Sequence, residues 1–198
     1  WLKFEFVISM EITVFYPVKK RSIADFAQVF PDGQLSSQPA EVGMVVTAVE
    51  TKLPMQNFSP EMVEERLQHA KDFIERAQPF CDAVKAEGVW ADFVDPVNGT
   101  PFYSSSSTTL SETDGSLSQF GFQILELGCC RALKHKTFMT RVLACVLCFR
   151  GDRSVVDKHL HLLERNQESA AEKQGDDAVD KQEDTAPVPP EAPAPPES

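Results

Sequence analysis

Apolar and polar side chains alternate strongly along residues 4–16, where one parity holds large apolar positions. These positions are Phe4, Phe6, Ile8, Met10, Ile12, Val14 and Tyr16. A period of two over this length predicts a strand with one buried face, which Pro17 ends. Helical spacing of apolar residues then predicts a short helix that stops at the turn of residues 30–33. The apolar run at residues 42–49, rich in β-branched side chains, predicts a second strand.

A long helix is predicted from Ser59 onward. Serine suits the N-cap, Pro60 suits the first helical position, and Glu61 places an acid in the first turn. Pro79 lies inside this helix, and we expect a kink there because proline removes a backbone donor. Apolar residues at helical spacing form one predicted buried stripe that ends near Gly88: Val63, Leu67, Ala70, Ile74, Ala77, Cys81 and Val84.

The second half of the domain carries shorter elements. Strands and helices in the resulting order predict an α+β fold or a mixed-sheet sandwich. We expect a strand at 89–94, a turn at 95–99, a Ser/Thr-rich loop at 104–118, strands at 130–135 and 141–149, and a closing helix at 155–163.

The composition changes after Leu163. Residues 164–198 hold ten acidic and three basic residues, six of the chain's 14 prolines and no aromatic residue. Such a segment cannot bury enough apolar surface to offset the entropy of ordering it, so we expect a disordered tail. Residues 1–163 are then long enough to form one globular domain with its own core.

The charge balance excludes some classes of protein. The net charge of −11 argues against a nucleic-acid-binding protein, which needs a positive face. The longest apolar run, residues 142–149, is eight residues long, and a membrane-spanning helix needs roughly 20. We therefore expect a protein that binds neither nucleic acid nor membrane.

The five cysteines favour a reducing compartment. Their number is odd and their spacing does not resemble a secreted disulfide framework, which favours the cytosol or the mitochondrial matrix. Cys145 and Cys148 resemble a C-x-x-C pair, but side chains three apart on a strand point to opposite faces. We expect both, and Cys81 on the helix stripe, to pack in the core as small hydrophobic residues.

Cys129 and Cys130 form the one reactive-looking pair. Gly128 before them allows backbone conformations closed to larger residues, and adjacent side chains on an extended segment point opposite ways. One sulfur can then face solvent while the other is buried. Cations beside a thiol favour the thiolate, the form that attacks electrophiles or binds soft metals. A concentrated positive patch follows the pair: Arg131, Lys134, Lys136 and Arg141.

A plainer interpretation stays open for this pair and for the other candidates. Both cysteines could be buried beside an ordinary basic edge strand. His135 is near enough in sequence to serve as a base, and the four histidines show no metal-ligand spacing with the cysteines. Asp92 and Asp95 could form a carboxylate pair, although Asp95 before Pro96 is typical of a turn.

Two motifs together resemble a known family. Residues 86–96 read A-E-G-V-W-A-D-F-V-D-P, and residues 112–130 read E-T-D-G-S-L-S-Q-F-G-F-Q-I-L-E-L-G-C-C. Their order and spacing resemble the C-terminal domain of the cblD cobalamin-trafficking family, the family of methylmalonic aciduria and homocystinuria type D. The resemblance extends from about Phe4 to His159, and the A-E-G-x-W-A-D-F run combined with F-G-F and L-G-C-C makes it specific.

The resemblance implies a nitroreductase-like α+β fold, a mixed or antiparallel sheet sandwich with flanking helices and no flavin. It also implies a non-enzymatic adaptor that binds no cobalamin alone and docks onto a cblC-like cobalamin-processing protein. The joint complex would direct cobalamin to methionine synthase, itself a candidate partner, and to methylmalonyl-CoA mutase. The protein would act in the cytoplasm, in mitochondria or in both.

The resemblance also assigns site residues. Cys129 would be the thiolate that binds the cobalt of cobalamin in the joint complex, with Gly128 and Cys130 in support. Partner contacts would fall on Trp90, Thr113, Asp114 and Arg131.

Two other classes of function stay open. A thiol oxidoreductase would use Cys129 in turnover, and a nitroreductase-like flavoprotein would bind flavin. The sequence offers neither a resolving cysteine at workable geometry nor an evident flavin-phosphate cluster. A plain interaction scaffold would instead bind its partner through the acidic residues 164–198.

Overall fold

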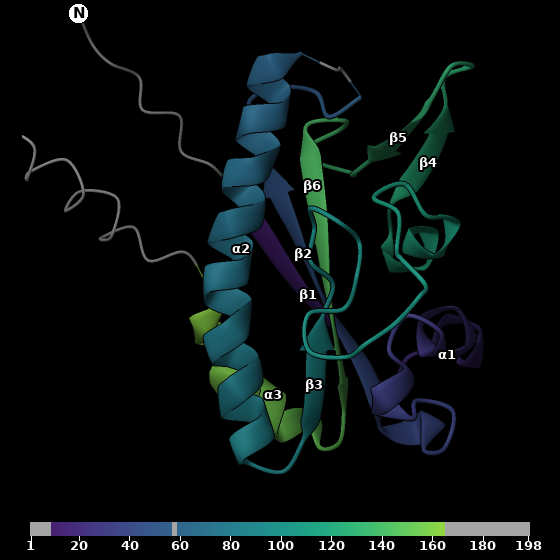
Figure 1. Ribbon diagram of the computed structural model, residues 1–198, viewed down its shortest axis with the longest axis vertical. Coiled ribbons are helices and arrows are strands. Elements are labelled where there is room, and N and C mark those ends of the chain that lie inside the picture. The colour runs from purple at the N-terminus through teal and green to yellow at the C-terminus, as the bar shows by residue number, and fades with distance from the viewer. Residues whose placement is uncertain (1–8, 57–58, 165–198) are drawn as a thin grey trace, which may run out of the picture. The chain divides into compact units, whose positions relative to one another are not determined.

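The structure is a computed structural model that describes residues 9–56 and 59–164 (Figure 1). The N-terminal part of the first predicted strand, residues 4–8, and nearly all of the predicted tail, residues 165–198, lie outside the described residues. Within the described ranges, none of the helices has the length and apolarity needed to cross a membrane.

A four-stranded antiparallel sheet forms the centre of the fold, with the strand order β1-β2-β6-β3. Its strands are β1 (Met10–Phe15), β2 (Val42–Glu50), β6 (Val142–Arg150) and β3 (Trp90–Phe93). β2 and β6 pair along their whole length, and their apolar runs are buried because both faces of the sheet are covered. These strands confirm the four predicted at these positions, as far as the described residues reach.

Two helices, α2 (Pro60–Ala86) and α3 (Arg153–His159), cover one face of this sheet (Figure 1). The Ser59 side chain accepts a hydrogen bond from the Met62 backbone N–H at 3.3 Å, which confirms the predicted N-cap. The helix continues past Pro79, which lies on its exposed side.

The buried face of α2 differs from the predicted stripe at its N-terminal end. Val63 and Leu67 are 46% and 47% exposed, whereas Met62 and the bulkier Phe73 and Phe80 are buried. These larger side chains lie beside the predicted stripe on the helix surface, and burying them removes more apolar surface from water. The buried face is therefore rotated toward them, and the prediction that Val63 and Leu67 are buried is wrong.

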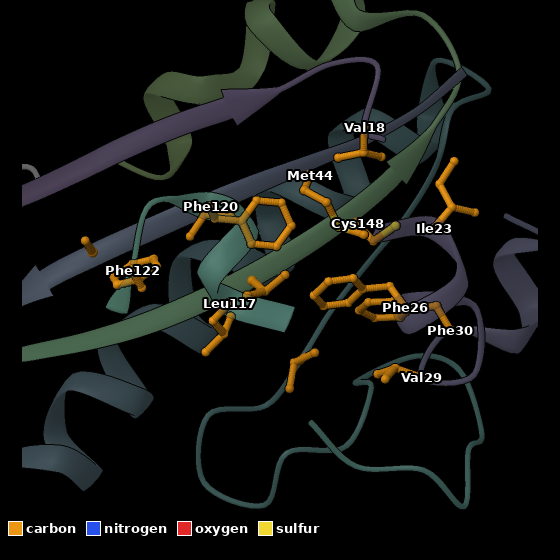
Figure 2. Close-up of a cluster of buried hydrophobic side chains, with 14 of the residues drawn as sticks. Val18, Ile23, Phe26, Val29, Phe30, Met44, Leu117, Phe120, Phe122 and Cys148 are labelled. Carbon is orange, nitrogen blue, oxygen red and sulfur yellow. The ribbon is translucent and has the colours of Figure 1, made fainter. Parts of the chain in front are cut away.

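Aromatic side chains cover the opposite face of the sheet. Phe26 comes from α1 (Lys20–Ala27), which confirms the short predicted helix, and Phe120 from a 3-10 helix (Gly115–Phe120), while Phe30 and Phe122 follow these elements. The Phe120 ring centroid lies 4.9 Å from that of Phe15 and 5.7 Å from that of Phe26. Figure 2 shows this layer, whose labelled aromatic residues are Phe26, Phe30, Phe120 and Phe122.

Two further strands, β4 (Gln123–Glu126) and β5 (Arg131–Lys134), form a separate antiparallel hairpin. β5 confirms the strand predicted at residues 130–135. The sequence does not predict β4, because Q-I-L-E is too short to show a period of two. Figure 1 places the hairpin on the side of the main sheet opposite α2. Ile124 and Leu133 pack against the aromatic layer, so the core holds the hairpin strands in place.

The closing helix is present as α3 followed by a 3-10 helix at Leu160–Leu162. With these elements, the described residues form an α+β fold with antiparallel sheets and a few helices. This confirms the predicted fold class at that level.

Candidate functional site

The connection between β4 and β5 carries the predicted thiol pair. Just beyond the last paired strand positions, the Leu127 N–H donates a hydrogen bond to the Cys130 carbonyl oxygen at 2.9 Å. Gly128 and Cys129 are therefore the two central residues of a tight hairpin loop. Gly128 has a φ of 82°, a left-handed conformation that favours glycine at the first central position of such a loop.

The two sulfur atoms of this loop lie close together. Cys129 is exposed, Cys130 is half-buried, and their Sγ atoms are 3.7 Å apart. The prediction that the two side chains point opposite ways is wrong, because the pair belongs to a turn and not to an extended strand. The alternative in which both cysteines are buried is wrong as well. A second thiol is therefore within reach of Cys129, which the sequence pattern did not predict.

The neighbouring Cys129 influences the ionisation of the Cys130 thiol. The pKa of the Cys130 thiol is raised above its usual value, chiefly by its hydrogen bond with Cys129. A negative charge on Cys129 adds to this effect, since it opposes a second charge on the neighbouring sulfur.

The predicted positive patch is largely neutralised. Arg131 follows the thiol pair directly, and its charge is shared with a carboxylate on the facing strand β4. The prediction of a concentrated patch is therefore wrong, because Arg131 pairs across the hairpin and the fold brings acids that are distant in sequence to the other cations. Three of the four cations form ion pairs at 2.9–3.0 Å: Arg131 with Glu126, Lys136 with Glu11, and Arg141 with Glu50.

His135 does not serve the thiols as a base. It follows β5 at the end away from the loop, five residues after Cys130, which is roughly 16 Å along a strand. Its ring is buried between Phe122 and Phe138, and its Nδ1 accepts the Phe138 backbone N–H at 3.4 Å. Burial lowers the pKa of this ring, so the neutral form is favoured. These contacts give His135 a structural role.

The four residues expected to contact a partner lie in three separate parts of the chain. Trp90 is half-buried on β3, with its ring 6.0 Å from that of Phe30. Asp114 accepts a hydrogen bond from a backbone N–H at 2.8 Å and caps the 3-10 helix, and Thr113 precedes it. Arg131 begins β5 beside the thiol pair. The structure thus places only Arg131 next to the cysteines along the chain.

Asp92 is a buried carboxylate whose role the sequence reading missed. Its side chain is fully buried on β3, where its Oδ1 accepts the backbone N–H groups of Phe93 at 2.7 Å and Tyr103 at 3.0 Å. Its Oδ2 accepts the Ser104 N–H at 2.9 Å. Asp95 instead accepts hydrogen bonds within its own turn, which confirms the turn interpretation. An acid within an apolar strand was the signal that could have pointed to Asp92.

The remaining cysteines pack in the core, as predicted. Cys148 lies in the aromatic layer of Figure 2, whereas Cys145 belongs to the cluster beneath α2, so the two occupy opposite faces of β6. Burial raises the pKa of Cys145 to about 12 and also raises those of Cys81 and Cys148. Over the described part of the chain, no three side chains of His, Cys, Asp or Glu gather as a metal site.

Comparison with known proteins points to one family. A family model described as methylmalonic aciduria and homocystinuria type D protein matches residues 18–151. The chain is 37% identical over 123 residues to the cobalamin trafficking protein CblD of Homo sapiens. It is 34% identical over 119 residues to the Gallus gallus protein of the same name, and 36% identical over 120 residues to that of Mus musculus.

These matches cover 60% of this chain and 39% of each relative, so the chain spans about two fifths of the length of the curated relatives. The range matched by the family model includes the whole β4–β5 hairpin and its thiol pair.

Proposed function

Because the chain belongs to the methylmalonic aciduria and homocystinuria type D protein family, we propose that it takes part in cobalamin trafficking. The proposed role is that of an adaptor. It docks onto a cblC-like cobalamin-processing protein and directs cobalamin toward methionine synthase and methylmalonyl-CoA mutase. The names of its curated relatives support the first part of this proposal.

The exposure of Cys129 at the tip of the β4–β5 hairpin is the observation that carries the mechanism. The hairpin strands are fixed to the core through Ile124 and Leu133, while the loop itself carries the exposed Cys129. A Cβ built on Gly128 would meet no atom within 4 Å apart from those of Gly128 and its two chain neighbours, so the loop is open on that side as well. Such a loop can enter a cavity on a second protein without any rearrangement of the central sheet.

The chemistry proposed for Cys129 is ligation of cobalt. Its thiol loses a proton to solvent, and a lone pair on the sulfur then forms a bond to the cobalt of cobalamin held by the partner. Thiolates suit soft transition-metal centres, and the thiolate is the form that binds. Cys130 forms a hydrogen bond with the sulfur of Cys129, and Gly128 allows the turn in which the pair lies.

We further propose that the protein acts without catalysis of its own, in the cytoplasm, in mitochondria or in both. Its α+β fold is proposed to be nitroreductase-like without flavin, and it binds no cobalamin alone. Thr113, Asp114 and Arg131 are proposed partner contacts, together with the exposed part of Trp90.

A spectroscopic titration tests the proposed function. Purified protein is added to the cblC-like partner loaded with cob(II)alamin, and the visible spectrum is followed. We expect a shift typical of thiolate ligation with the native protein and with Cys130→Ser, and no shift with Cys129→Ser. Cys130→Ser is the matched control because it removes one sulfur from the same loop. An unchanged shift with Cys129→Ser contradicts the mechanism.

The same preparation separates the proposal from the flavoprotein alternative. A yellow protein whose colour follows it through purification would favour a nitroreductase-like enzyme. We expect a colourless protein.

A further inference from the structure

The two thiols at the hairpin tip can react with each other as well as with an external centre. Their Sγ atoms are 3.7 Å apart, whereas a disulfide requires about 2.0 Å. Each sulfur therefore needs to move by less than about an ångström toward the other. Side chains of this kind hop between rotamers readily at an exposed site, where few neighbours hold them.

The surroundings of the pair permit such a movement. Cys129 is exposed, and beyond Gly128 itself and its two chain neighbours no atom lies within 4 Å of the position of a Cβ on Gly128. The loop is closed by the hydrogen bond from the Leu127 N–H to the Cys130 carbonyl oxygen, which does not involve either sulfur. The strands below the loop are fixed to the core. The rearrangement is thus confined to the loop.

A bond between these two sulfurs would be strained and therefore reversible. Adjacent Cα atoms lie about 3.8 Å apart across a trans peptide, which is shorter than the roughly 4.4–6.8 Å span of ordinary disulfides. Strain of this kind makes a disulfide easier to reduce, and labile disulfides are the regulatory ones. The other three cysteines are buried, so the oxidation has one accessible place to begin.

We propose that Cys129 and Cys130 form a two-thiol redox site, which a small disulfide such as oxidised glutathione converts to a reversible disulfide between the two adjacent residues. This modification site goes beyond the proposed function and does not depend on it. Cys129 is the attacking residue because it is the more exposed, and Cys130 is the resolving residue because its sulfur already touches that of Cys129.

The reaction proceeds in two exchanges. Cys129 loses its proton to solvent, and its thiolate attacks one sulfur of oxidised glutathione, so that the S–S bond breaks and one glutathione thiolate leaves. Cys130 then loses its proton and attacks the Cys129 sulfur, and the second glutathione leaves as a thiolate. Two electrons pass from the cysteine pair to oxidised glutathione, which becomes two molecules of glutathione.

One consequence connects the site to the proposed function and rests on it. A sulfur held in this disulfide has no thiolate to offer, so the oxidised protein cannot ligate cobalt through Cys129. Reduction by a thiol restores that capacity. The redox state of the Cys129–Cys130 pair would then control whether the proposed adaptor can bind the cobalt of cobalamin.

Thiol counting and intact mass on the full chain test the proposal without cobalamin or partner, so the result is separate from that of the function. The folded protein is incubated with oxidised glutathione, and free thiols are titrated after denaturation. We expect the count to fall from five to three, with the loss of the mass of two hydrogen atoms and no covalent dimer. Reduced glutathione should restore all five thiols.

Two variants identify the residues. Cys130→Ser should accumulate a stable glutathione adduct on Cys129, because no resolving thiol remains. Cys129→Ser should react more slowly than native protein, since only the half-buried Cys130 is left. A persistent glutathione adduct on the native protein, a disulfide-linked dimer, or five remaining thiols would each overturn the proposal.

Discussion

Asp92 on β3 and Tyr103 on the following loop are joined by a hydrogen bond of 3.0 Å from the Tyr103 N–H to the buried Asp92 carboxylate. The same carboxylate accepts the N–H of Ser104, so one side chain holds the start of the long loop against the edge of the sheet. Among the strands that the structure describes, β3 pairs with β6 alone, and this loop occupies its other side. The edge of the sheet is thus closed by an acid inside an otherwise apolar strand.

Replacement of this acid should destabilise the fold. Asp92→Asn keeps the shape of the side chain, but its NH₂ group replaces one of the two oxygens that accept backbone N–H groups. It also removes the carboxylate charge that strengthens these hydrogen bonds. We expect the free energy of unfolding to fall by about 2–4 kcal/mol, measured by denaturant titration. Asp95→Asn, in an ordinary turn, is the control and should cost under about 1 kcal/mol. Equal losses in the two variants would contradict the assigned role of Asp92.

The buried ring of His135 should make stability depend on pH. Burial, the larger cause, lowers its pKa, although Glu11 acts in the opposite direction. Below about pH 6.5 the histidine of the unfolded chain therefore binds a proton more readily than the buried ring of the folded protein does. The contribution of neutral His135 to the stability of the folded state is complete above that pH and is lost as the pH falls through the folded pKa.

We expect His135→Asn to show a smaller loss of unfolding free energy than native protein between about pH 7.5 and about pH 5.5. Exposed His161 supplies the matched control, since His161→Asn should retain the native dependence. Denaturant titrations at several pH values measure this difference. A native slope in His135→Asn would show that another group is responsible.

Gly128→Ala should disturb the hairpin loop by backbone strain. Its φ of 82° is costly for residues with a Cβ, while the space around that Cβ is open, so the cost is conformational and not steric. We expect a loss of about 1 kcal/mol in unfolding free energy, together with weaker thiolate ligation by Cys129. Gly115→Ala is the control, because its Cβ also has open space and its φ is not positive. Equal effects on ligation would argue against a role for the turn.

Removal of residues 164–198 should leave partner binding unchanged. The family match ends at residue 151, and the thiol pair lies within it. Calorimetric titration of the cblC-like partner with the full chain and with residues 1–163 measures the two affinities. A loss of binding on truncation would favour the scaffold interpretation, in which the acidic residues bind the partner.

Sequence patterns predicted the parts of the fold that local physics controls. The N-cap at Ser59 and the opposite faces of Cys145 and Cys148 depend only on neighbours in the chain, and both are confirmed. The buried face of α2 was harder to predict, because it depends on which side chains the sheet accommodates. Val63 and Leu67 fit a helical stripe, yet larger residues beside them are buried in their place.

The geometry of the candidate site also depends on tertiary neighbours that the local sequence does not reveal. The sequence singled out Cys129 and Cys130, but it treated them as residues of an extended segment because β4 was too short to recognise. Without β4 there is no hairpin, and without a hairpin there is no turn to bring the two sulfurs within 3.7 Å. The acids that pair with Lys136 and Arg141 were likewise hidden, since Glu11 lies 125 positions before Lys136 and Glu50 lies 91 positions before Arg141.

The most direct test of the central claim is X-ray absorption at the cobalt edge in the ternary sample of this protein, the cblC-like partner and cob(II)alamin. The account predicts a sulfur atom in the first coordination shell with native protein, and only nitrogen and oxygen neighbours with Cys129→Ser. A shell without sulfur in the native sample, or one that keeps sulfur in Cys129→Ser, would contradict it.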